Sequence, residues 1–575
     1  MVVLKGKDIR DIDILNNYER WIKFINKDGD VKQELKELAD SSDKLYDAFY
    51  KNLSFGTGGL RGIIGAGTNR MNIYTVGKAS QGLSNYINKN FQKEKRKIAV
   101  SYDSREKSEL FAKTACCIFA ANGIKAEIYK ELMPTPCLSY AVRKLGCAAG
   151  IMITASHNPA EYNGYKVYGA DGCQITTDAA EKILVEIEQL DIFKDIQEID
   201  FQEGILQGKI CYIENHVYDS YIEEVKQQSL VKGNLKINRD ITIVYTPLNG
   251  TGLKPILRVL KESGYKKIYV VEEQKNPDGR FPTCPYPNPE NKEAMGLGLK
   301  MAKEKQADLL LATDPDCDRV GIAVQRNEED YVLLSGNETG LLLFDYICSR
   351  RRENGFMPDN PVMVKTIVTT DMAEQIAENY GVQTINVLTG FKFIGEQIGK
   401  LEEKGKVDSY IFGFEESYGY LSGSYVRDKD AVNASFLICE MYAYYKANGI
   451  NLLDKLEELY LHYGFCLNTL YSYECKGAAG FEKMQEIMEE MRVGVGIFGT
   501  KQVKECLDYK NGLGGLPKSD VLKFILEDNC SVVIRPSGTE PKLKVYVSVS
   551  ALDREKAEEE TKKIEKSLKE YIICK

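Results

Sequence analysis

The densest group of chemically active residues is a run of three alternating aspartates, Asp314, Asp316 and Asp318, followed by Arg319. Three carboxylates in one turn repel one another, and at an effective dielectric constant of about 20 each close pair costs about 4 kcal/mol. A divalent cation removes that cost, and ligands that are all oxygen favour Mg²⁺ over Zn²⁺. The run follows the apolar segment 307–312, and α/β sheets bind ligands at the carboxyl ends of their strands. The sequence therefore predicts a magnesium site.

A calcium-binding EF-hand also begins with alternating acidic residues, but its loop needs a Gly at the sixth position and a Glu at the twelfth. Here Arg319 stands in place of the Gly and Gln325 in place of the Glu. We therefore do not expect calcium sensing, and the remaining alternative is an acidic turn in water.

Ser156 is the candidate nucleophile, in the segment Thr-Ala-Ser-His-Asn-Pro at 154–159, which also follows an apolar run. A Ser-His-Asp triad fits poorly, because His157 is the adjacent residue and neighbours in an extended segment point apart. The better role for Ser156 is to accept and donate a phosphoryl group beside a metal ion. Lys166 is then a candidate acid/base, since a desolvated Lys near a cation can have its pKa lowered towards neutrality. Taken alone, Ser156 would be an ordinary loop serine and Lys166 a surface charge.

A third segment concentrates groups that bind anions. It offers the guanidinium of Arg535, the hydroxyls of Ser537 and Thr539, and backbone N–H groups that Gly538 allows to converge. A plain hairpin turn seldom gathers so many, so the segment predicts a phosphate cradle.

Weaker signals lie elsewhere. The loop 56–62 is rich in Gly and contains Arg61, but it has no Lys-Ser/Thr and no preceding strand, so it is not a P-loop. The segment 412–419 ends a strand with two carboxylates and a hydroxyl, groups that suit sugar hydroxyls, and a polar turn is the equal alternative. Thr389 and Gly390 follow a strand in the same way.

Rigid elements must position these segments, and the sequence alternates strand and helix. The run 97–106 reads as a strand ending in a polar loop, 108–123 as an amphipathic helix, and a helix is expected near Ser139–Leu145 after a turn at Met133–Pro136. Such alternation predicts a parallel sheet covered on both faces. Two similar sets follow, and the C-terminal part differs, with a hairpin at 531–551 and a charged helix after it. The predicted domains are 1–210, 211–325, 326–452 and 453–575.

Composition bounds the class of protein. The 575 residues are too many for one core, and 43% hydrophobic with 28% charged residues is ordinary for a soluble globular protein. The net charge of -8 argues against a nucleic-acid partner. The 15 Cys are odd in number without a C-x-x-C pair, the start lacks the apolar core of a signal peptide, and the apolar runs are too short to span a bilayer. We expect a reduced, cytoplasmic protein with no membrane partner.

Four motifs together resemble the alpha-D-phosphohexomutase superfamily: T-A-S-H-N-P, D-P-D-x-D-R, G-F-E-E-S and R-P-S-G-T-E-P, in the family order and one per domain. The resemblance runs from about Phe55 to Tyr546. The length of the chain and its segment S-F-G-T-G-G-L-R-G resemble the bacterial phosphoglucomutase and phosphopentomutase branch, which is a long form of the family. The resemblance implies three related α/β domains with mainly parallel mixed sheets and a C-terminal α+β domain of TATA-binding-protein-like topology, around a central cleft.

The resemblance also implies roles, matched motif by motif. Ser156 is the phosphoserine, and with the three aspartates it holds one Mg²⁺ per chain. The other implied catalytic residues are Arg61, His157 and Lys166. The implied substrate-binding residues are Arg319 (a contact to the phosphoserine), Thr389, Gly390, Glu415, Ser417 and Lys429. The implied distal phosphate site is Arg535, Ser537, Gly538 and Thr539.

The implied reaction is the reversible interconversion of glucose 1-phosphate and glucose 6-phosphate, with glucose 1,6-bisphosphate as intermediate and primer. The partners are then small sugar phosphates, and the chain a monomer or weak homo-oligomer. Phosphopentomutase or phosphomannomutase activity is the near alternative, although Glu415-Glu416-Ser417 favours glucose. A metal-dependent phosphatase with an Asp as carrier, and a silent sugar-phosphate sensor, are the other classes; the intact Ser, Asp and Lys positions argue against the sensor.

Overall fold

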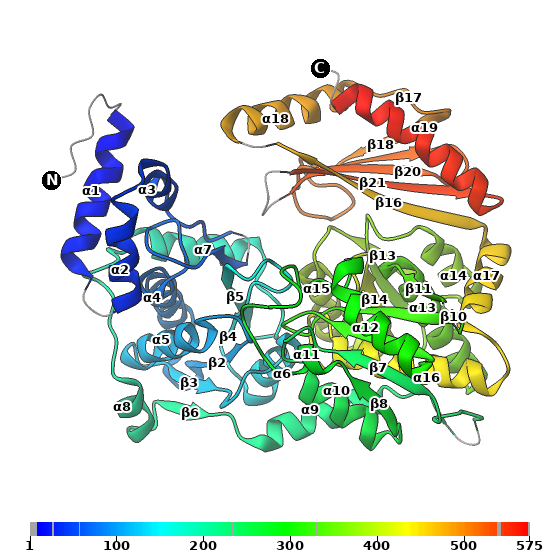
Figure 1. The fold of residues 1–575 in the computed structure, drawn as a ribbon, viewed down its shortest axis with the longest axis horizontal. Helices are drawn as coiled ribbons and strands as arrows, with labels where there is room; N and C mark the ends of the chain where they lie inside the picture. The colour runs from blue at the N-terminus through cyan, green and yellow to red at the C-terminus, as the bar shows by residue number, and fades with distance from the viewer. Residues whose placement is uncertain are drawn as a thin grey trace.

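Four β-sheets follow one another along the chain, each in its own domain (Figure 1). The structure is a computed structural model that describes residues 9–25, 28–56, 58–232, 235–328, 330–475, 477–537 and 542–572, with the side chains of 9–11, 477–479 and 481 excepted. The first three sheets are mixed and carry helices, and the fourth is antiparallel. The predicted fold class is confirmed.

The first domain contains a six-stranded sheet in the order β1-β5-β4-β2-β3-β6. Four strands of it run parallel, and the β5 and β1 edge is antiparallel. Its strands are β1 (Gly59–Ile63), β2 (Lys97–Tyr102), β3 (Lys125–Ile128), β4 (Ala149–Ile153), β5 (Tyr162–Gly169) and β6 (Ile210–Tyr212). Its helices are α4 (Ile73–Asn90), α5 (Ser108–Ala121), α6 (Thr135–Leu145), α7 (Thr177–Glu188) and α8 (Phe201–Leu206), with a 3₁₀ turn at Lys93–Lys95.

Two predictions in this domain need correction. The helix α6 begins at Thr135 and not near Ser139, because Pro136 occupies the first turn, where its missing N–H leaves no hydrogen bond unmade. The Gly-rich loop is in part the edge strand β1, which pairs with β5. A Cβ at Gly59 would lie 1.8 Å from the carbonyl oxygen of Tyr165, so only Gly allows this pairing.

The second and third domains repeat the plan. The second has the strand order β11-β10-β9-β7-β8 and the third β13-β12-β14-β15, each with an antiparallel edge. The strands of the second domain are β7 (Thr242–Thr246), β8 (Lys267–Val270), β9 (Leu309–Thr313), β10 (Val320–Asn327) and β11 (Asp330–Leu334). Its helices are α9 (Asn215–Gln227), α10 (Leu253–Glu262), α11 (Glu272–Lys275) and α12 (Lys292–Lys305).

The strands of the third domain are β12 (Val362–Thr366), β13 (Gln383–Val387), β14 (Tyr410–Glu415) and β15 (Gly419–Leu421). Its helices are α13 (Gly336–Glu353), α14 (Met372–Tyr380), α15 (Phe391–Glu403), α16 (Ala431–Ala447) and α17 (Leu452–Tyr463), with a 3₁₀ turn at Val407–Ser409.

The C-terminal domain is an antiparallel sheet in the order β16-β21-β20-β19-β18-β17. Its strands are β16 (Phe465–Glu474), β17 (Ile497–Phe498), β18 (Lys501–Asp508), β19 (Leu522–Leu526), β20 (Ser531–Pro536) and β21 (Lys542–Ala551). The helices α18 (Gly477–Val493) and α19 (Arg554–Ile572) lie on its outer face (Figure 1). The hairpin and the charged helix predicted here are confirmed, and α19 buries one stripe of side chains against the sheet.

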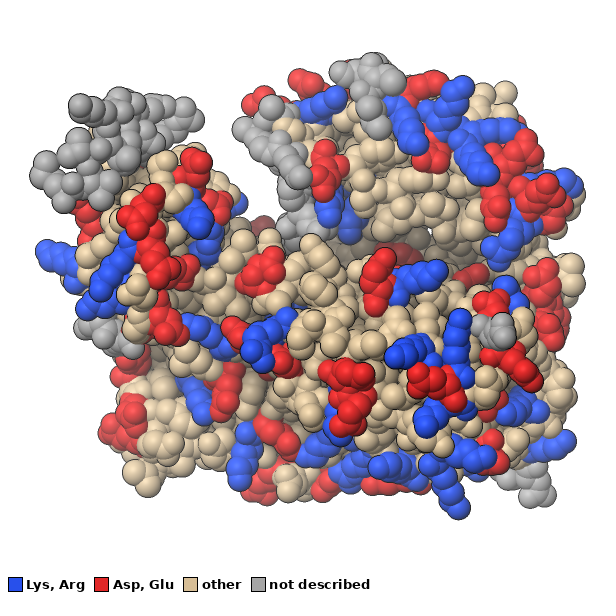
Figure 2. Space-filling view, viewed as in Figure 1, with Lys and Arg blue, Asp and Glu red and all other residues tan. Residues whose placement is uncertain are grey.

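The C-terminal domain sits on the third domain through a small mixed contact. Val533 and Tyr546 of its sheet pack with Ile367 and Leu388. Beside them the Lys523 ammonium donates to Asp371 Oδ1 at 3.1 Å. Between this domain and the N-terminal helices the surface is hollowed (Figure 2).

Three N-terminal helices, α1 (Ile9–Phe24), α2 (Gly29–Leu38) and α3 (Ser42–Phe49), form a separate cluster of the first domain. Trp21 is buried at its centre, with its ring centroid 5.6 Å from those of Phe49, Tyr74 and Phe193. These aromatic contacts attach the helices to the first domain. In the part of the chain that is described, no helix combines the length and apolar character needed to cross a bilayer.

Replacing Gly59 by Ala is expected to destabilise the first domain by several kcal/mol, on the order of 3, because φ at Gly59 is +141° and the new Cβ meets backbone. The apparent Tm should fall, as read by calorimetry. The control is Gly29→Ala at the start of α2, where a Cβ meets nothing within 4 Å and the Tm should not fall. Equal Tm values for the two variants would contradict this account of β1.

Candidate active site

Ser156 lies at the point where the first and second domains meet. It follows β4 in a turn where its φ is +52°, a left-handed conformation that costs about 1–2 kcal/mol in a residue with a side chain. Its N–H donates to Thr154 Oγ1 at 2.7 Å, and its hydroxyl donates to Asp314 Oδ2 of the second domain at 2.8 Å. The side chain is buried. The turn therefore aims the hydroxyl at the aspartate cluster.

The same turn overturns one prediction. His157 was expected to point away from Ser156, yet its Nδ1 lies 3.2 Å from Ser156 Oγ, because the left-handed turn brings consecutive side chains together. Burial and the positive charges of Arg319 and Arg61 hold the pKa of His157 well below its usual value. The imidazole is therefore neutral, and it can exchange a hydrogen bond with the Ser156 hydroxyl.

The three aspartates are fully buried in the turn between β9 and β10, and they bring one oxygen each within 4.8 Å of one another. The N–H groups of Asp318 and Arg319 donate to Asp314 Oδ1 at 3.1 and 3.0 Å. Burial and the charges of Asp318 and Asp316 raise the pKa of Asp314 well above its usual value. The backbone N–H groups therefore do not offset the negative charge of the three carboxylates.

A cation fits the cluster. Asp316 Oδ1 and Asp318 Oδ1 are buried and have no hydrogen-bond partner among the described residues. Buried carboxylate oxygens without a donor are costly, and a metal ion supplies what they lack. Ser156 Oγ lies 2.8 Å from Asp314 Oδ2 and so offers a further oxygen beside the three carboxylates. The three aspartates predicted as ligands are thus brought together, with Ser156 beside them.

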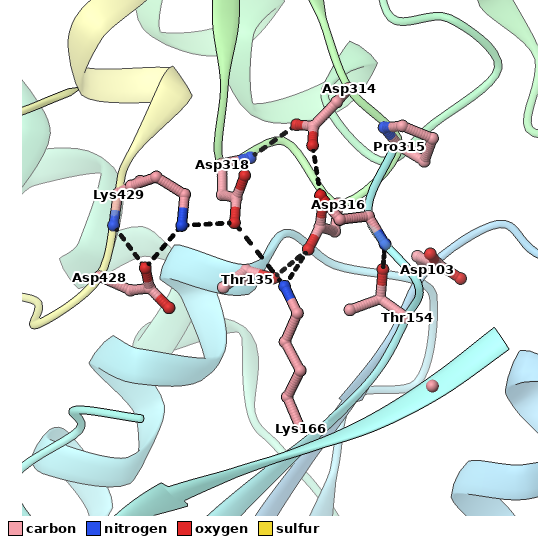
Figure 3. Close-up of polar contacts among 12 residues, drawn as sticks. Asp103, Thr135, Thr154, Lys166, Asp314, Pro315, Asp316, Asp318, Asp428 and Lys429 are labelled. Carbon is pink, nitrogen blue, oxygen red and sulfur yellow. Dashed lines mark hydrogen bonds and ion pairs between the residues drawn. The ribbon is translucent and has the colours of Figure 1, made fainter. Parts of the chain in front are cut away.

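Two lysines from other domains balance the remaining charge (Figure 3). Lys166 rises from β5 of the first domain and places Nζ 2.9 Å from Asp316 Oδ2 and 3.7 Å from Asp318 Oδ2. Lys429 comes from the third domain and places Nζ 3.1 Å from Asp318 Oδ2. Burial disfavours charge on Lys166, but the attraction of the two carboxylates outweighs it and raises its pKa. The expected lowering of this pKa is therefore not found, because the aspartates are its immediate partners.

Two contacts here had little signal in the sequence. Thr135, at the start of α6, donates from Oγ1 to Asp316 Oδ2 at 3.0 Å. Asp428 accepts from Lys429 and from Tyr168, whose hydroxyl is 2.8 Å from Asp428 Oδ2. Tyr168 stands two residues after Lys166, on the same face of β5, and that spacing is the one signal that could have suggested it.

The sugar-loop residues meet at the end of β14. Glu415 is buried, and its Oε1 accepts from the Gly390 N–H at 2.9 Å, so the segment 389–390 and the loop after β14 form one surface. Thr389 Oγ1 is buried without a hydrogen-bond partner in the described part of the chain. Ser417 is half-buried two residues beyond Glu415. Free acceptors and donors of this kind suit a polyhydroxylated ligand.

Two predicted arginines flank the cluster. Arg61, on β1, donates to Asn158 Oδ1 in the Ser156 loop at 3.2 Å. Arg319 is ion-paired with Glu290 at 2.8 Å and keeps Nε 3.8 Å from Asp318 Oδ1. Its guanidinium is thus shared between the cluster and a neighbouring carboxylate.

The described residues of the predicted phosphate cradle, Arg535 and Ser537, lie at the end of β20 in the C-terminal domain. Arg535 is half-buried at the end of β20, and its Nη2 is 3.4 Å from the Tyr546 hydroxyl. The Ser537 N–H donates to the Lys542 carbonyl at 2.8 Å, which closes the base of the loop. Gly538 and Thr539 lie outside the described residues. Burial and the charge of Glu415 raise the pKa of Glu416 to about 7, and the positive charge of Arg535 opposes that rise, so Arg535 lies near the loop after β14.

Models of phosphoglucomutase/phosphomannomutase alpha/beta/alpha domains I, II and III match residues 52–192, 219–327 and 335–462, and the model of the C-terminal domain matches 481–567. A phosphoglucomutase from Staphylococcus saprophyticus is 36% identical over 569 residues, covering 96% of this chain and 99% of that protein. One from Staphylococcus aureus is 36% identical and covers 93% of this chain and 96% of its own length.

Among solved structures, the open form of the Paramecium phosphoprotein parafusin, a phosphoglucomutase, superposes with a TM-score of 0.68 at 19% identity, covering 90% of this chain and 94% of that one. A phosphoglucomutase/phosphomannomutase family protein from Burkholderia thailandensis gives 0.66 at 17% identity, covering 90% and 97%. These two likenesses concern the fold.

A divalent cation is expected to bind the aspartate cluster and stabilise the protein. Titrating metal-free protein with divalent chloride salts, MgCl₂ among them, should raise the apparent Tm; at 100 times the Kd the gain is about 2.7 kcal/mol. Asp318→Asn should lose the shift, and Asp330→Asn, on β11 with a half-exposed side chain, should keep it. A shift that survives in Asp318→Asn would place the cation elsewhere.

Proposed function

Because the chain belongs to the phosphoglucomutase/phosphomannomutase family, we propose that it interconverts α-D-glucose 1-phosphate and glucose 6-phosphate with Ser156 as the phosphoryl carrier. The chain is an isomerase of the phosphohexomutase kind. The observation that carries the role of Ser156 is its hydrogen bond of 2.8 Å to Asp314 Oδ2, which joins a hydroxyl of one domain to the carboxylate cluster of the next.

The reaction consists of two transfers that mirror each other. In the first, the bond from phosphorus to Ser156 Oγ breaks and a bond from phosphorus to the free hydroxyl of the sugar monophosphate forms, which gives glucose 1,6-bisphosphate. In the second, the bisphosphate has turned end over end, and its other phosphoryl group returns to Ser156. Each transfer moves one proton between the sugar hydroxyl and Oγ, so no water is consumed. The same bisphosphate primes an unphosphorylated chain.

Lys166 is the proposed acid and base of these transfers. Its carboxylate partners keep it protonated at rest, so it can donate the proton that Oγ gains when the phosphoryl group leaves. The amine that remains takes up the proton of the sugar hydroxyl. The neutral His157 supports Oγ at 3.2 Å, and Arg61 places a positive charge at the same loop.

Asp314, Asp316, Asp318 and Ser156 would hold Mg²⁺, the hard cation that all-oxygen sites prefer. Bound there, it neutralises charge on the transferred group and on the oxygen of Ser156. Arg319 and Lys429 border the same site and would contact the phosphoryl oxygens.

The rest of the substrate lies towards the third and fourth domains. Glu415, Ser417, Thr389 and Gly390 would bind the sugar hydroxyls. Arg535, Ser537, Gly538 and Thr539 would bind the phosphate that is not being transferred. A guanidinium with backbone donors has little shape preference, so it can accept either phosphate of the bisphosphate. We place the enzyme in the cytoplasm, with small sugar phosphates as its ligands.

Ser156→Ala should lose the phosphoryl carrier. Intact mass after incubation with glucose 1,6-bisphosphate should show one added phosphoryl group in the native chain and none in the variant, with peptide mapping to Ser156. Turnover should fall by about 10³-fold or more. Ser349→Ala, a half-buried helical serine of the third domain whose hydroxyl donates to the Tyr346 carbonyl, is the control and should match the native chain. Full turnover in Ser156→Ala with release of free phosphate would indicate a phosphatase with an Asp carrier.

Glucose should be the preferred sugar. The kcat/KM for glucose 1-phosphate should exceed that for mannose 1-phosphate and ribose 1-phosphate by about tenfold or more, because a misplaced or missing hydroxyl loses at least one hydrogen bond, whose net worth is about 1 kcal/mol. The measurement is initial rates on the three 1-phosphates with a common primer. A clear preference for ribose 1-phosphate would make the chain a phosphopentomutase.

A further inference from the structure

The guanidinium of Arg105 is the hub of the Ser156 loop, although none of the motifs above includes it. It donates to the backbone carbonyls of Ser156 at 2.6 Å, of Pro159 at 2.7 Å and of Tyr162 at 3.0 Å, and to that of Asn158. Its exposed fraction is 3%. Four backbone carbonyls therefore converge on one cation, and of these the Pro159 carbonyl also accepts from the Tyr162 N–H at 3.1 Å.

Arg105 is itself fixed within the first domain. Its Nε lies 3.5 Å from Asp103 Oδ2, and its N–H donates to Asp103 Oδ1 at 2.9 Å. Asp103 is also buried and accepts from the Ser108 hydroxyl at 2.7 Å. The turn between β2 and α5 thus carries the guanidinium to the Ser156 loop as a rigid unit.

The second domain closes over this unit. The ring of Phe281, which is 1% exposed, lies with its centroid 5.1 Å from Arg105 Cζ, in the geometry of a cation–π contact. Phe281 has a φ of +46°, a strained conformation that the surrounding turn maintains. Gly279 approaches so closely that a Cβ there would lie 2.3 Å from the backbone nitrogen of Glu106. Gly279 and Phe281 of the second domain therefore form an interdomain clamp, which holds Arg105 and its turn in the first domain.

The clamp is also connected to the metal loop. The Asn249 side chain donates to the Asn276 carbonyl at 2.8 Å, which fixes the start of the segment that carries Phe281. Two residues later, the N–H and hydroxyl of Thr251 donate to the Pro315 carbonyl at 2.8 and 2.9 Å. Pro315 lies between two of the aspartates. The segment 249–251 therefore contacts both the segment that carries Phe281 and the aspartate turn.

We propose that Arg105, clamped by Phe281 and Gly279, is a positioning residue for phosphoryl transfer. It holds Ser156 in its left-handed turn and sets the distance between Oγ and the aspartate cluster. A residue in a strained conformation persists only when its surroundings over-determine it, and the four carbonyl contacts supply that constraint. The inference rests on the proposed role of Ser156 as phosphoryl carrier.

Loosening the clamp has a definite expected signature. Arg105→Lys keeps the charge but cannot reach four carbonyls, so kcat should fall by about 10²-fold, the effect of a displacement of about 1 Å at the reacting atom. The KM for glucose 1-phosphate should stay within about threefold, because the sugar and distal phosphate sites are elsewhere. Water should gain access to phosphorylated Ser156. The hydrolysis ratio, which is the amount of free phosphate released per phosphoryl group transferred to sugar, should therefore rise.

Phe281 gives a second series that tests the clamp without touching the loop. Phe281→Tyr keeps the ring and should keep native kcat, whereas Phe281→Leu fills the space without a π face and should lower kcat by about tenfold and raise the hydrolysis ratio. The matched control is Phe356→Leu, which removes a similar arginine contact, that of Arg351 at 5.6 Å in the third domain, and should leave both quantities unchanged. The Tm of every variant is measured alongside.

Native kcat and a native hydrolysis ratio in Arg105→Lys would overturn the proposal. So would identical behaviour of Phe281→Leu and Phe281→Tyr, or losses of kcat that follow the loss of folded protein with no change in the ratio. Intact mass separates this failure from that of the proposed function. If native protein takes up a phosphoryl group at Ser156 and the Arg105 variant behaves as native, the positioning role alone is wrong. If native protein never takes up a phosphoryl group, the assignment of Ser156 as the phosphoryl carrier is wrong.

Discussion

The balance of charge around three buried carboxylates is the constraint on which the rest of the site depends. Isolated buried carboxylates are among the most costly groups a protein can hold, and each needs a positive partner or a strong donor. Among the described residues, backbone N–H groups of the second domain donate to one of the three, Asp314. The first domain adds Lys166 and Thr135, and the third adds Lys429. The cluster is therefore tolerable only when three domains are docked, and the same docking brings Ser156 to it.

A short segment of the third domain secures that docking. The Arg427 N–H donates to Ser139 Oγ of the first domain at 2.9 Å, and Asp428 accepts from Tyr168 of the same domain. Asp430 accepts from the Tyr221 hydroxyl on α9, the helix that leads from the first domain into the second. Lys429 stands between these contacts. A Cβ at position 419 would lie 2.1 Å from the Lys429 side chain. Only Gly at this position therefore leaves space for Lys429 to extend to Asp318. Backbone and side-chain contacts on both sides thus fix one lysine against the metal loop.

The fourth domain is attached differently. Its contacts with the third include a small apolar cluster and the charged group of Lys365, Asp371 and Lys523. One buried apolar cluster extends from the first three domains into this one. In the described part of the chain, the polar contacts that hold this domain are with the third domain, and the surface beside it is hollowed (Figure 2). In the proposed reaction, this domain contributes Arg535 and Ser537 to the binding of the phosphate that is not being transferred, while the other three domains hold the rest of the substrate.

Much of this protein was readable from the sequence. The alternation of apolar strands and amphipathic helices predicted three α/β units, and the C-terminal hairpin and helix were confirmed. The spacing of Asp314, Asp316 and Asp318 predicted a metal site, because three carboxylates on alternate residues of one turn have few other stable arrangements. Backbone conformation was not readable. The left-handed φ of Ser156 brought His157 to the hydroxyl against expectation, and the antiparallel pairing of β1 turned a Gly-rich loop into a strand. The pKa of Lys166 is raised and not lowered as expected, because its carboxylate partners come from a different domain. Sequence pattern specifies which groups are present and which local elements carry them. The distances among Ser156, Lys166, Arg105 and the aspartates depend on how separate domains pack, and only the tertiary structure decides that.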